Sequence, residues 1–345
     1  MSGTDDKSLT IHVVHSVKGG CGKTAFSLFK ALSCADVSTK QHAEVLYFDA
    51  DFKGTSIKTL IYGEDEESFN GINEKKWDWM TPYQHSKSGI RTKLVFQKDY
   101  NPATLNDIMD GKKKNFIDIV QHGAVFLEET KTAEMTLEQE QIYSYIDFVF
   151  SSPEATDRAM YEYDAAYGNA KLTQGRFKAK IKEIFNEIYK YGDSFDCPYK
   201  DVIIDMPPGE EEFSQTMIMV LKKWANEVNK KERKVKLNYY AVTTNDRGHL
   251  YAEVGNLARL QQPCATGKNF DKYIVVLNEL RAGEFANASV AIEFFQHKLK
   301  EKSGVRKQSN FYCVNRFSDS YYSFCRDNTI DCFDYKITKE EVVFY

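Results

Sequence analysis

The chain has 345 residues, a hydrophobic fraction of 42% and a net charge of −4. That length can bury a large core, and the negative charge disfavours a strongly basic nucleic-acid binder while leaving a local basic patch open. No apolar run approaches the roughly 18 residues that a membrane span requires, and the acidic start, Met1 to Asp6, is unlike a secretory signal. We therefore expect a cytoplasmic protein without a transmembrane segment. The seven cysteines, none of them in C-x-x-C spacing, are expected to be free thiols.

The N-terminal part predicts a strand, a glycine-rich turn, a helix and a second strand. Residues 9–17 form a continuous β-branched apolar run, and residues 24–35 place Phe26, Phe29 and Leu32 on one helical face. A second apolar run, residues 45–48, leads into Asp49-Ala50-Asp51. Strand, helix and strand within about 40 residues indicate a βαβ unit, and so a parallel sheet covered by helices.

The rest of the chain alternates between predicted helices and strands. Residues 62–100 are polar and aperiodic except for a short strand at 94–96, and residues 102–121 predict a helix, a turn at Gly111 and a second helix. Later strands are expected at 146–150, 202–205, 237–243, 273–278 and 311–314, and helices at 171–191, 214–229, 249–260 and 284–302. We predict one α/β domain over residues 1–345, a three-layer, doubly wound, mainly parallel sheet with an insertion at about 62–145.

The turn after the first strand has the composition of a phosphate-binding loop. It reads Lys18-Gly19-Gly20-Cys21-Gly22-Lys23-Thr24, with Ala25 next. Glycines let the backbone curl so that its N–H groups point at phosphate oxygens, and the N-terminus of the following helix favours the same anion. Lys23 is expected to reach the β- and γ-phosphates, and the Thr24 hydroxyl to ligate Mg²⁺. The predicted nucleotide-binding residues are Lys18, Gly19, Gly20, Cys21, Gly22, Lys23, Thr24 and Ala25.

Three carboxylates follow predicted strands, at the edge where parallel sheets bind ligands. Asp205 ends an apolar run, which is the form of a Walker B strand whose carboxylate holds Mg²⁺. Asp49 and Asp51 are two residues apart, so an extended strand places them on one face. The sequence therefore predicts a magnesium site near Thr24 and Asp205, with Asp49 and Asp51 at the same edge of the sheet.

The second lysine of the loop indicates a family. The common phosphate-binding loop has glycine at the position of Val17, and here valine is followed by Lys18. This two-lysine loop is a deviant Walker A motif, and with Asp49-Ala50-Asp51 and Asp205-Met206-Pro207-Pro208-Gly209 it resembles the ParA/MinD group of ATPases. The resemblance covers most of the chain outside roughly 62–100 and 121–145.

The resemblance implies roles that the residues alone do not give. It implies that Lys18 crosses a homodimer interface that sandwiches two ATP molecules, and that Asp51 positions the attacking water with Asp49 near the Mg²⁺ shell. It assigns Asn278 to the adenine ring. Lys18, Lys23 and Asp51 are then the catalytic residues, and ATP hydrolysis is expected to be slow and stimulated by a partner protein.

The sequence leaves three functions open. The first is a dimeric switch in plasmid or chromosome partition, or in positioning a cellular machine. The second is an ATP-dependent scaffold with little turnover. The third, metal-cluster assembly, lacks the C-x-x-C pair of the cluster carriers. Residues 336–345 are too short and acidic for a C-terminal membrane helix.

Non-specific DNA binding is a further possibility left open by the sequence. It would use Lys222, Lys223, Lys230, Lys231, Arg233, Lys234 and Lys236, although a solvated helix end explains this cluster better.

Overall fold

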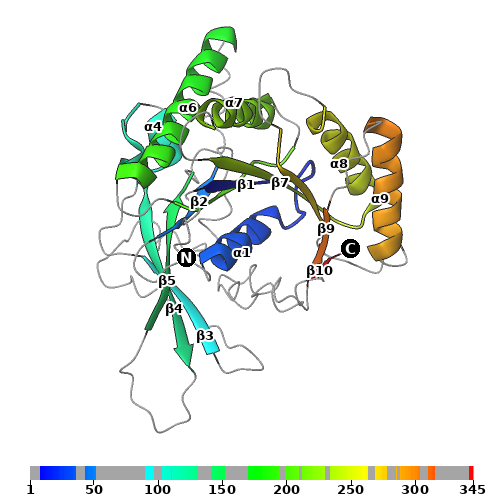
Figure 1. The fold of residues 1–345 in the computed structure, drawn as a ribbon, viewed down its shortest axis with the longest axis horizontal. Coiled ribbons are helices and arrows are strands. Elements are labelled where there is room, and N and C mark those ends of the chain that lie inside the picture. Colours follow the sequence, from blue (N-terminus) through cyan, green and yellow to red (C-terminus); the bar gives the residue numbers. More distant parts are fainter. Residues whose placement is uncertain are drawn as a thin grey trace, which may run out of the picture.

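A ten-stranded sheet organises the protein (Figure 1). The structure, a computed structural model, describes residues 8–35, 43–51, 90–96, 103–109, 111–129, 141–151, 170–194, 199–209, 212–229, 234–262, 269–277, 285, 288–303, 310–314 and 342–344. The strand order is β10-β9-β8-β7-β1-β6-β2-β5-β4-β3. The seven strands from β9 to β5 pair in parallel, and β10, β4 and β3 add to the two edges in antiparallel fashion.

The strands and helices have the following bounds. The strands are β1 (Leu9–His15), β2 (Val45–Asp49), β3 (Ile90–Phe96), β4 (Gln121–Glu129), β5 (Gln141–Val149), β6 (Asp201–Asp205), β7 (Val235–Thr243), β8 (Lys272–Leu277), β9 (Asn310–Val314) and β10 (Val342–Phe344). The α-helices are α1 (Lys23–Ala35), α4 (Leu105–Met109), α6 (Ala170–Ser194), α7 (Glu212–Val228), α8 (Arg247–Leu260) and α9 (Ala288–Ser303), and residues Phe116–Ile119 form a 3₁₀ helix. No helix within these described ranges is long and apolar enough to cross a membrane.

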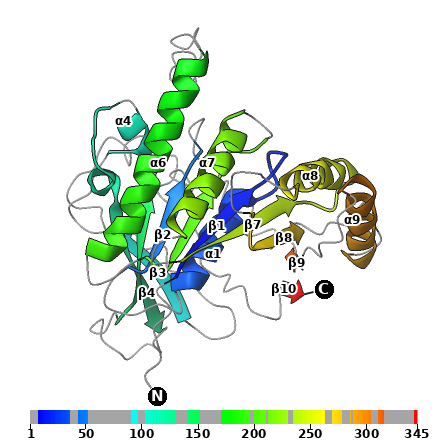
Figure 2. The same ribbon diagram turned by 45° about the horizontal axis from the view of Figure 1, so that its top comes forward.

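Helices cover both faces of the sheet. The ribbon shows α1 on one face and α6, α7 and α8 on the other, with α9 beside α8 (Figures 1 and 2). A parallel pair of strands needs a crossover connection, and right-handed crossovers in opposite directions from the centre put helices on opposite faces. The α/β, doubly wound, mainly parallel architecture predicted from the sequence is confirmed.

The core lies between the sheet and the α6–α7 layer. Every residue of β2 is buried, as a central strand covered on both faces requires. The ring of Phe185 on α6 lies 6.1 Å from that of Phe48 on β2 and 5.4 Å from that of Trp224 on α7. These rings join a sheet strand to two helices and so fix the helical layer over the strands that carry the candidate site.

The structure corrects the prediction for residues 102–145. The predicted second helix is only the 3₁₀ turn Phe116–Ile119, and the chain then enters β4, which we did not predict. The predicted turn at Gly111 is confirmed, with a φ of 76° that favours glycine. β4 was missed because its apolar positions are consecutive and its end is acidic, so it shows no period of two. With β3 it continues the central sheet, and Figure 1 shows this edge projecting beyond the helical layers.

Truncation of Phe185 tests the core. Phe185→Ala removes a fully buried ring between Phe48 and Trp224, so we expect unfolding to need about 3–5 kcal/mol less free energy. Urea denaturation followed by circular dichroism measures this. Met219→Ala on α7 is the matched control, since Met219 is 47% exposed and its loss should change stability by less than about 0.5 kcal/mol. Equal effects of the two substitutions would contradict the assigned packing.

Candidate nucleotide-binding site

Three central strands bring the predicted site residues together. β6 lies between β1 and β2, and its register pairs Asp205 with Val14 on one side and with Asp49 on the other. The carboxyl ends of the three strands are therefore level. The loop after β1, the segment after β2 and Asp205 consequently meet at one edge, where open parallel sheets bind ligands.

The loop after β1 has the backbone that a phosphate cradle requires. Gly20 and Gly22 have φ values of 75° and 73°, in the left-handed region that other residues rarely adopt. A Cβ atom at Gly19 or Gly20 would meet nothing within 4 Å, so the space beside these two exposed glycines is open. The N–H of Phe26 donates to the carbonyl of Gly22 (3.0 Å), which starts α1 directly at the end of the loop. The predicted arrangement of strand, loop and helix is confirmed.

A buried ion pair lies at the floor of the loop. Lys23 Nζ donates to Asp205 Oδ1 (2.5 Å), and both side chains are almost inaccessible to solvent. The same ammonium lies 3.3 Å from Thr24 Oγ1. One positive charge thus occupies the space between a hydroxyl and a carboxylate. This pair of hard oxygen donors suits Mg²⁺, so the residues fit the metal that the sequence predicts.

Two further side chains hold Asp205 and were not predicted. Ser27 Oγ donates to Asp205 Oδ1 (2.9 Å), and Tyr47 OH donates to Asp205 Oδ2 (3.1 Å). Burial, together with the charge of Asp205, raises the pKa of Tyr47 well above its usual value, so this hydroxyl stays a donor. Ser27 lies one helical turn after Lys23, a spacing that could have indicated it. Tyr47 could be found only once β2 was placed beside β6.

Asp49 and Asp51 have different surroundings. Asp49 is fully buried, and its two carboxylate oxygens accept hydrogen bonds from the N–H groups of Asp51 (3.0 Å) and Ser151 (3.1 Å). The Ser151 hydroxyl also donates to the Asp49 carbonyl (2.8 Å). Asp49 therefore joins the ends of β2 and β5, and its place in the metal shell stays a prediction. Asp51 is half-buried just beyond it, and its catalytic role stays a prediction as well.

A second polar network holds the base of the loop. His15 Nε2 donates to the carbonyl of Gly209 (2.8 Å), and Tyr239 OH donates to His15 Nδ1 (2.7 Å). Burial lowers the pKa of His15 to about 4, so the ring is neutral and carries its proton on Nε2. This contact links the end of β1 to the segment after Asp205. Its one signal in the sequence is a histidine at the end of an apolar strand.

The same network continues to the loop itself. Asn256 on α8 donates to Tyr239 OH (2.8 Å) and to Glu253 Oε1 (2.7 Å). The other oxygen of Glu253 accepts the backbone N–H of Val17 (3.1 Å). The first residues of the loop are thus fixed by α8 as well as by β1.

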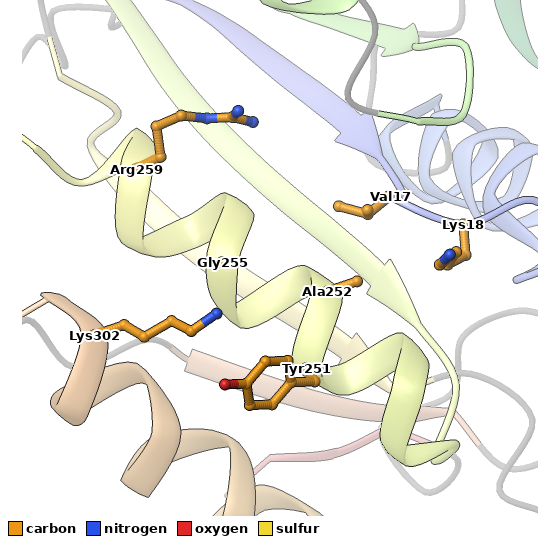
Figure 3. A pocket seen from close by; sticks show the side chains of 7 residues that line it. All are labelled: Val17, Lys18, Tyr251, Ala252, Gly255, Arg259 and Lys302. Carbon is orange, nitrogen blue, oxygen red and sulfur yellow. The ribbon is translucent and has the colours of Figure 1, made fainter.

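Lys18 lies on the exposed rim of the loop, beside a basic pocket. The pocket has a volume of about 510 Å³ and is lined by Val17, Lys18, Tyr251, Ala252, Gly255, Arg259 and Lys302 (Figure 3). Figure 3 shows that its walls come from the loop, from α8 and from α9. Lys18 therefore differs from the buried Lys23, and its ammonium can meet groups that approach from outside.

The remaining predicted residues are placed as follows. Cys21 is buried and lies in the loop, where its Sγ donates to the Lys18 carbonyl (3.1 Å). Ala25 belongs to α1, but its side chain lies outside the described residues, as does the whole of Asn278. In the lysine cluster considered for DNA, Lys222 is buried and donates to the Leu260 carbonyl (3.3 Å), so it does not belong to an exposed patch. Lys223, Lys234 and Lys236 are exposed, and residues 230–233 lie outside the description.

No protein-family model matches the sequence, and no curated protein matches it at a significant level. Among solved structures, the chain is similar to the cell division ATPase MinD of Pyrococcus furiosus, at 15% identity over 95% of this chain and 92% of that one, with a TM-score of 0.49. It is also similar to an ATP complex of McdA from Cyanothece (14% identity, 94% and 89% covered, TM-score 0.46). A plasmid partition protein of Borrelia burgdorferi is similar at 10% identity, 93% and 94% covered, with a TM-score of 0.45.

The buried His15 predicts a pH dependence of stability. Because the pKa of His15 is about 4 in the folded chain and near 6.5 when unfolded, acid protonates the unfolded chain first. The free energy of unfolding should therefore fall between pH 6.5 and pH 4, with a share from His15 on the order of 3 kcal/mol. Urea denaturation across this range measures it. His15→Gln should remove this share of the pH dependence, whereas His297→Gln, at an exposed histidine, should leave the profile unchanged. Identical profiles for wild type and His15→Gln would refute the assignment.

Proposed function

We propose that this chain is a Mg-ATP-binding ATPase of the ParA/MinD type that works as a homodimeric switch. The observation that carries the proposal is the position of the Lys23 ammonium between the Thr24 hydroxyl and the Asp205 carboxylate, under an open glycine loop at the start of α1. Lysine, hydroxyl and carboxylate in this arrangement are the parts that phosphoryl-transfer sites of the P-loop class use. The loop sequence with its second lysine adds the family resemblance.

Different residues would bind the phosphates, the Mg²⁺ ion, the attacking water and the adenine ring. The N–H groups of the glycine loop and the N-terminus of α1 would bind the phosphate oxygens. Lys23 would turn from Asp205 to the β- and γ-phosphates, and Thr24 and Asp205 would then hold Mg²⁺. The metal would supply positive charge to the phosphate oxygens. Asp51, half-buried beside this edge, would orient the attacking water, and Asn278 would bind adenine.

The exposed position of Lys18 supports a dimer as the working unit. Lys18 lies on the rim of the loop, whereas Lys23 lies buried at its floor, so one lysine serves its own site and the other can serve a second chain. Two chains facing each other would enclose two ATP molecules, each phosphate group meeting the partner's loop. Turnover would be slow and would rise when a partner protein stabilises this dimer.

The ATP cycle would be read out by other molecules. The His15 contact with the Gly209 carbonyl connects the loop to the segment after Asp205, which would respond to the γ-phosphate. We place the protein in the cytoplasm, in plasmid or chromosome partition or in positioning a cellular machine. Non-specific DNA would be one surface that it binds. Because Lys222 is buried, fewer lysines of the cluster are exposed for that contact than the sequence alone predicts.

Substitutions at Lys23 and Asp51 separate binding from hydrolysis. Lys23→Ala should weaken Mg-ATP binding by about 10- to 100-fold, since a charged hydrogen bond to phosphate is lost. Asp51→Ala should keep binding but lower turnover by about 100-fold or more. Fluorescent-nucleotide titration and phosphate release measure the two, with Lys223→Ala at an exposed position as control. Because Lys23→Ala leaves Asp205 with fewer partners, its fold is checked by circular dichroism.

A folded Lys23→Ala protein that binds ATP normally would refute the site. Normal ATP binding without turnover in the wild type, with DNA and candidate partners present, would instead identify a scaffold.

Substitution of Lys18 tests whether the chain dimerises around ATP. With Asp51→Ala to preserve bound ATP, light scattering after size exclusion should give twice the monomer mass in Mg-ATP and the monomer mass in ADP. Adding Lys18→Ala should leave ATP binding by each chain within a few-fold and shift the mass back to the monomer, because the charge that meets the partner's phosphates is gone. Lys302→Ala, on the far wall of the same pocket, is the control. A Lys18→Ala variant that still dimerises with ATP would contradict this role.

A further inference from the structure

Three side chains of different chemistry gather beneath the last turn of α1, at the end opposite to the phosphate loop. His12 on β1, Cys34 on α1 and Asp201 on β6 place one ligand atom each within 4.8 Å of the others. His12 and Cys34 are buried at 5% and 8% exposure, and the Asp201 side chain is 25% exposed. Within the described ranges this is the one group of its kind.

The sheet register produces this cluster. Asp201 pairs with Thr10, two residues before His12, so His12 and Asp201 lie on the same face of neighbouring parallel strands. Their side chains touch, with His12 Nε2 2.8 Å from Asp201 Oδ1. Helix α1 packs over this face, and its last turn brings Cys34 to the pair.

We propose that His12, Cys34 and Asp201 form a binding site for a zinc-class divalent cation. Imidazole nitrogen, thiolate sulfur and carboxylate oxygen are the three ligand types of protein zinc sites. Water can supply the fourth ligand through the partly exposed Asp201 side. Mg²⁺ and Ca²⁺ prefer sets of oxygen ligands, so this site differs in metal preference from the one near Thr24. The inference is independent of the proposed ATPase function.

The tyrosine that contacts the other ring nitrogen of His12 fits a metal-bound histidine. Tyr240 OH lies 3.1 Å from His12 Nδ1. Without a metal, His12 donates from Nε2 to the Asp201 carboxylate, so its Nδ1 accepts from the Tyr240 hydroxyl. With the metal on Nε2, the proton moves to Nδ1 and the tyrosine oxygen accepts it, because a hydroxyl can do either. A ligating histidine whose other nitrogen is held in this way is the usual pattern.

Binding of a cation changes the protonation and the charge of this cluster. Burial raises the pKa of the Cys34 thiol to about 11, so the thiol is neutral until the cation replaces its proton. Binding therefore forms metal–sulfur, metal–nitrogen and metal–oxygen bonds and releases one proton to solvent. Lys30 and Lys272 are the cations that face His12, and they oppose the metal charge. Asp201, the thiolate formed on binding and the negative end of the α1 dipole favour it.

Cobalt gives a direct readout of the site. Chelator-treated wild-type protein titrated with Co²⁺ should show a thiolate-to-metal charge-transfer band that saturates at one equivalent, and Zn²⁺ should abolish it while excess Mg²⁺ should not. Cys34→Ala should lose the band, whereas Cys21→Ser, at the other described buried cysteine, should keep it. Zn²⁺ should also raise the melting temperature of the wild type by a few degrees but not that of Cys34→Ala.

Two outcomes would overturn the proposal: a wild-type protein with no band at saturating Co²⁺, or a full band in Cys34→Ala. If Cys34→Ala does not fold by circular dichroism, Asp201→Asn serves instead, since its side chain reaches solvent. It should bind Co²⁺ at least 10-fold more weakly, and unchanged affinity would equally overturn the proposal.

Discussion

The buried ion pair between Lys23 and Asp205 sets the conditions for the rest of the site. A single buried charge is strongly unfavourable, and removing one partner of such a pair typically costs about 3–5 kcal/mol. The pair therefore ties the start of α1 to the end of β6, two segments 182 residues apart in the chain. Ser27 and Tyr47 satisfy the carboxylate further. In the proposed function, phosphate would take over Lys23 and a metal cation would take over Asp205, so the same balance of charge would hold with and without nucleotide.

The loop above this pair is held by a neutral histidine of β1 and by a glutamate of α8. His15 stays uncharged because it is buried, and it can therefore bond both the Tyr239 hydroxyl and the Gly209 carbonyl. Glu253 then holds the N–H of Val17 from α8. Movement of the segment after Asp205 would have to break the His15 contact. Movement of the loop away from this segment would have to break the same contact. The positions of the loop and of this segment are therefore coupled.

Patterns that are local in the chain were predictable, and contacts set by the sheet order were not. The glycines, Lys23 and Thr24 lie within one short segment, and Asp205 directly ends an apolar run, so their positions followed from sequence. Ser151, which braces Asp49 from 102 residues away, and Tyr47 depend on which strands are neighbours. β4 was missed because its apolar residues are consecutive. The adenine contact of Asn278 stays a prediction, since that residue lies outside the described ones.

Helix α1 connects the two sites that we infer, and its polarity suits each of them. Its first turn carries no acidic residue and its last turn no basic one. The positive end of the helix dipole thus faces the phosphate loop with no acidic residue in its own first turn, and the negative end lies beside His12, Cys34 and Asp201. From Lys23 to Cys34 the helix spans about 16 Å. A cation that ties the last turn to β1 and β6 would restrict the same rigid element whose first turn must bind phosphate. The two sites would then be coupled through the position of α1 on the sheet, without any shared ligand.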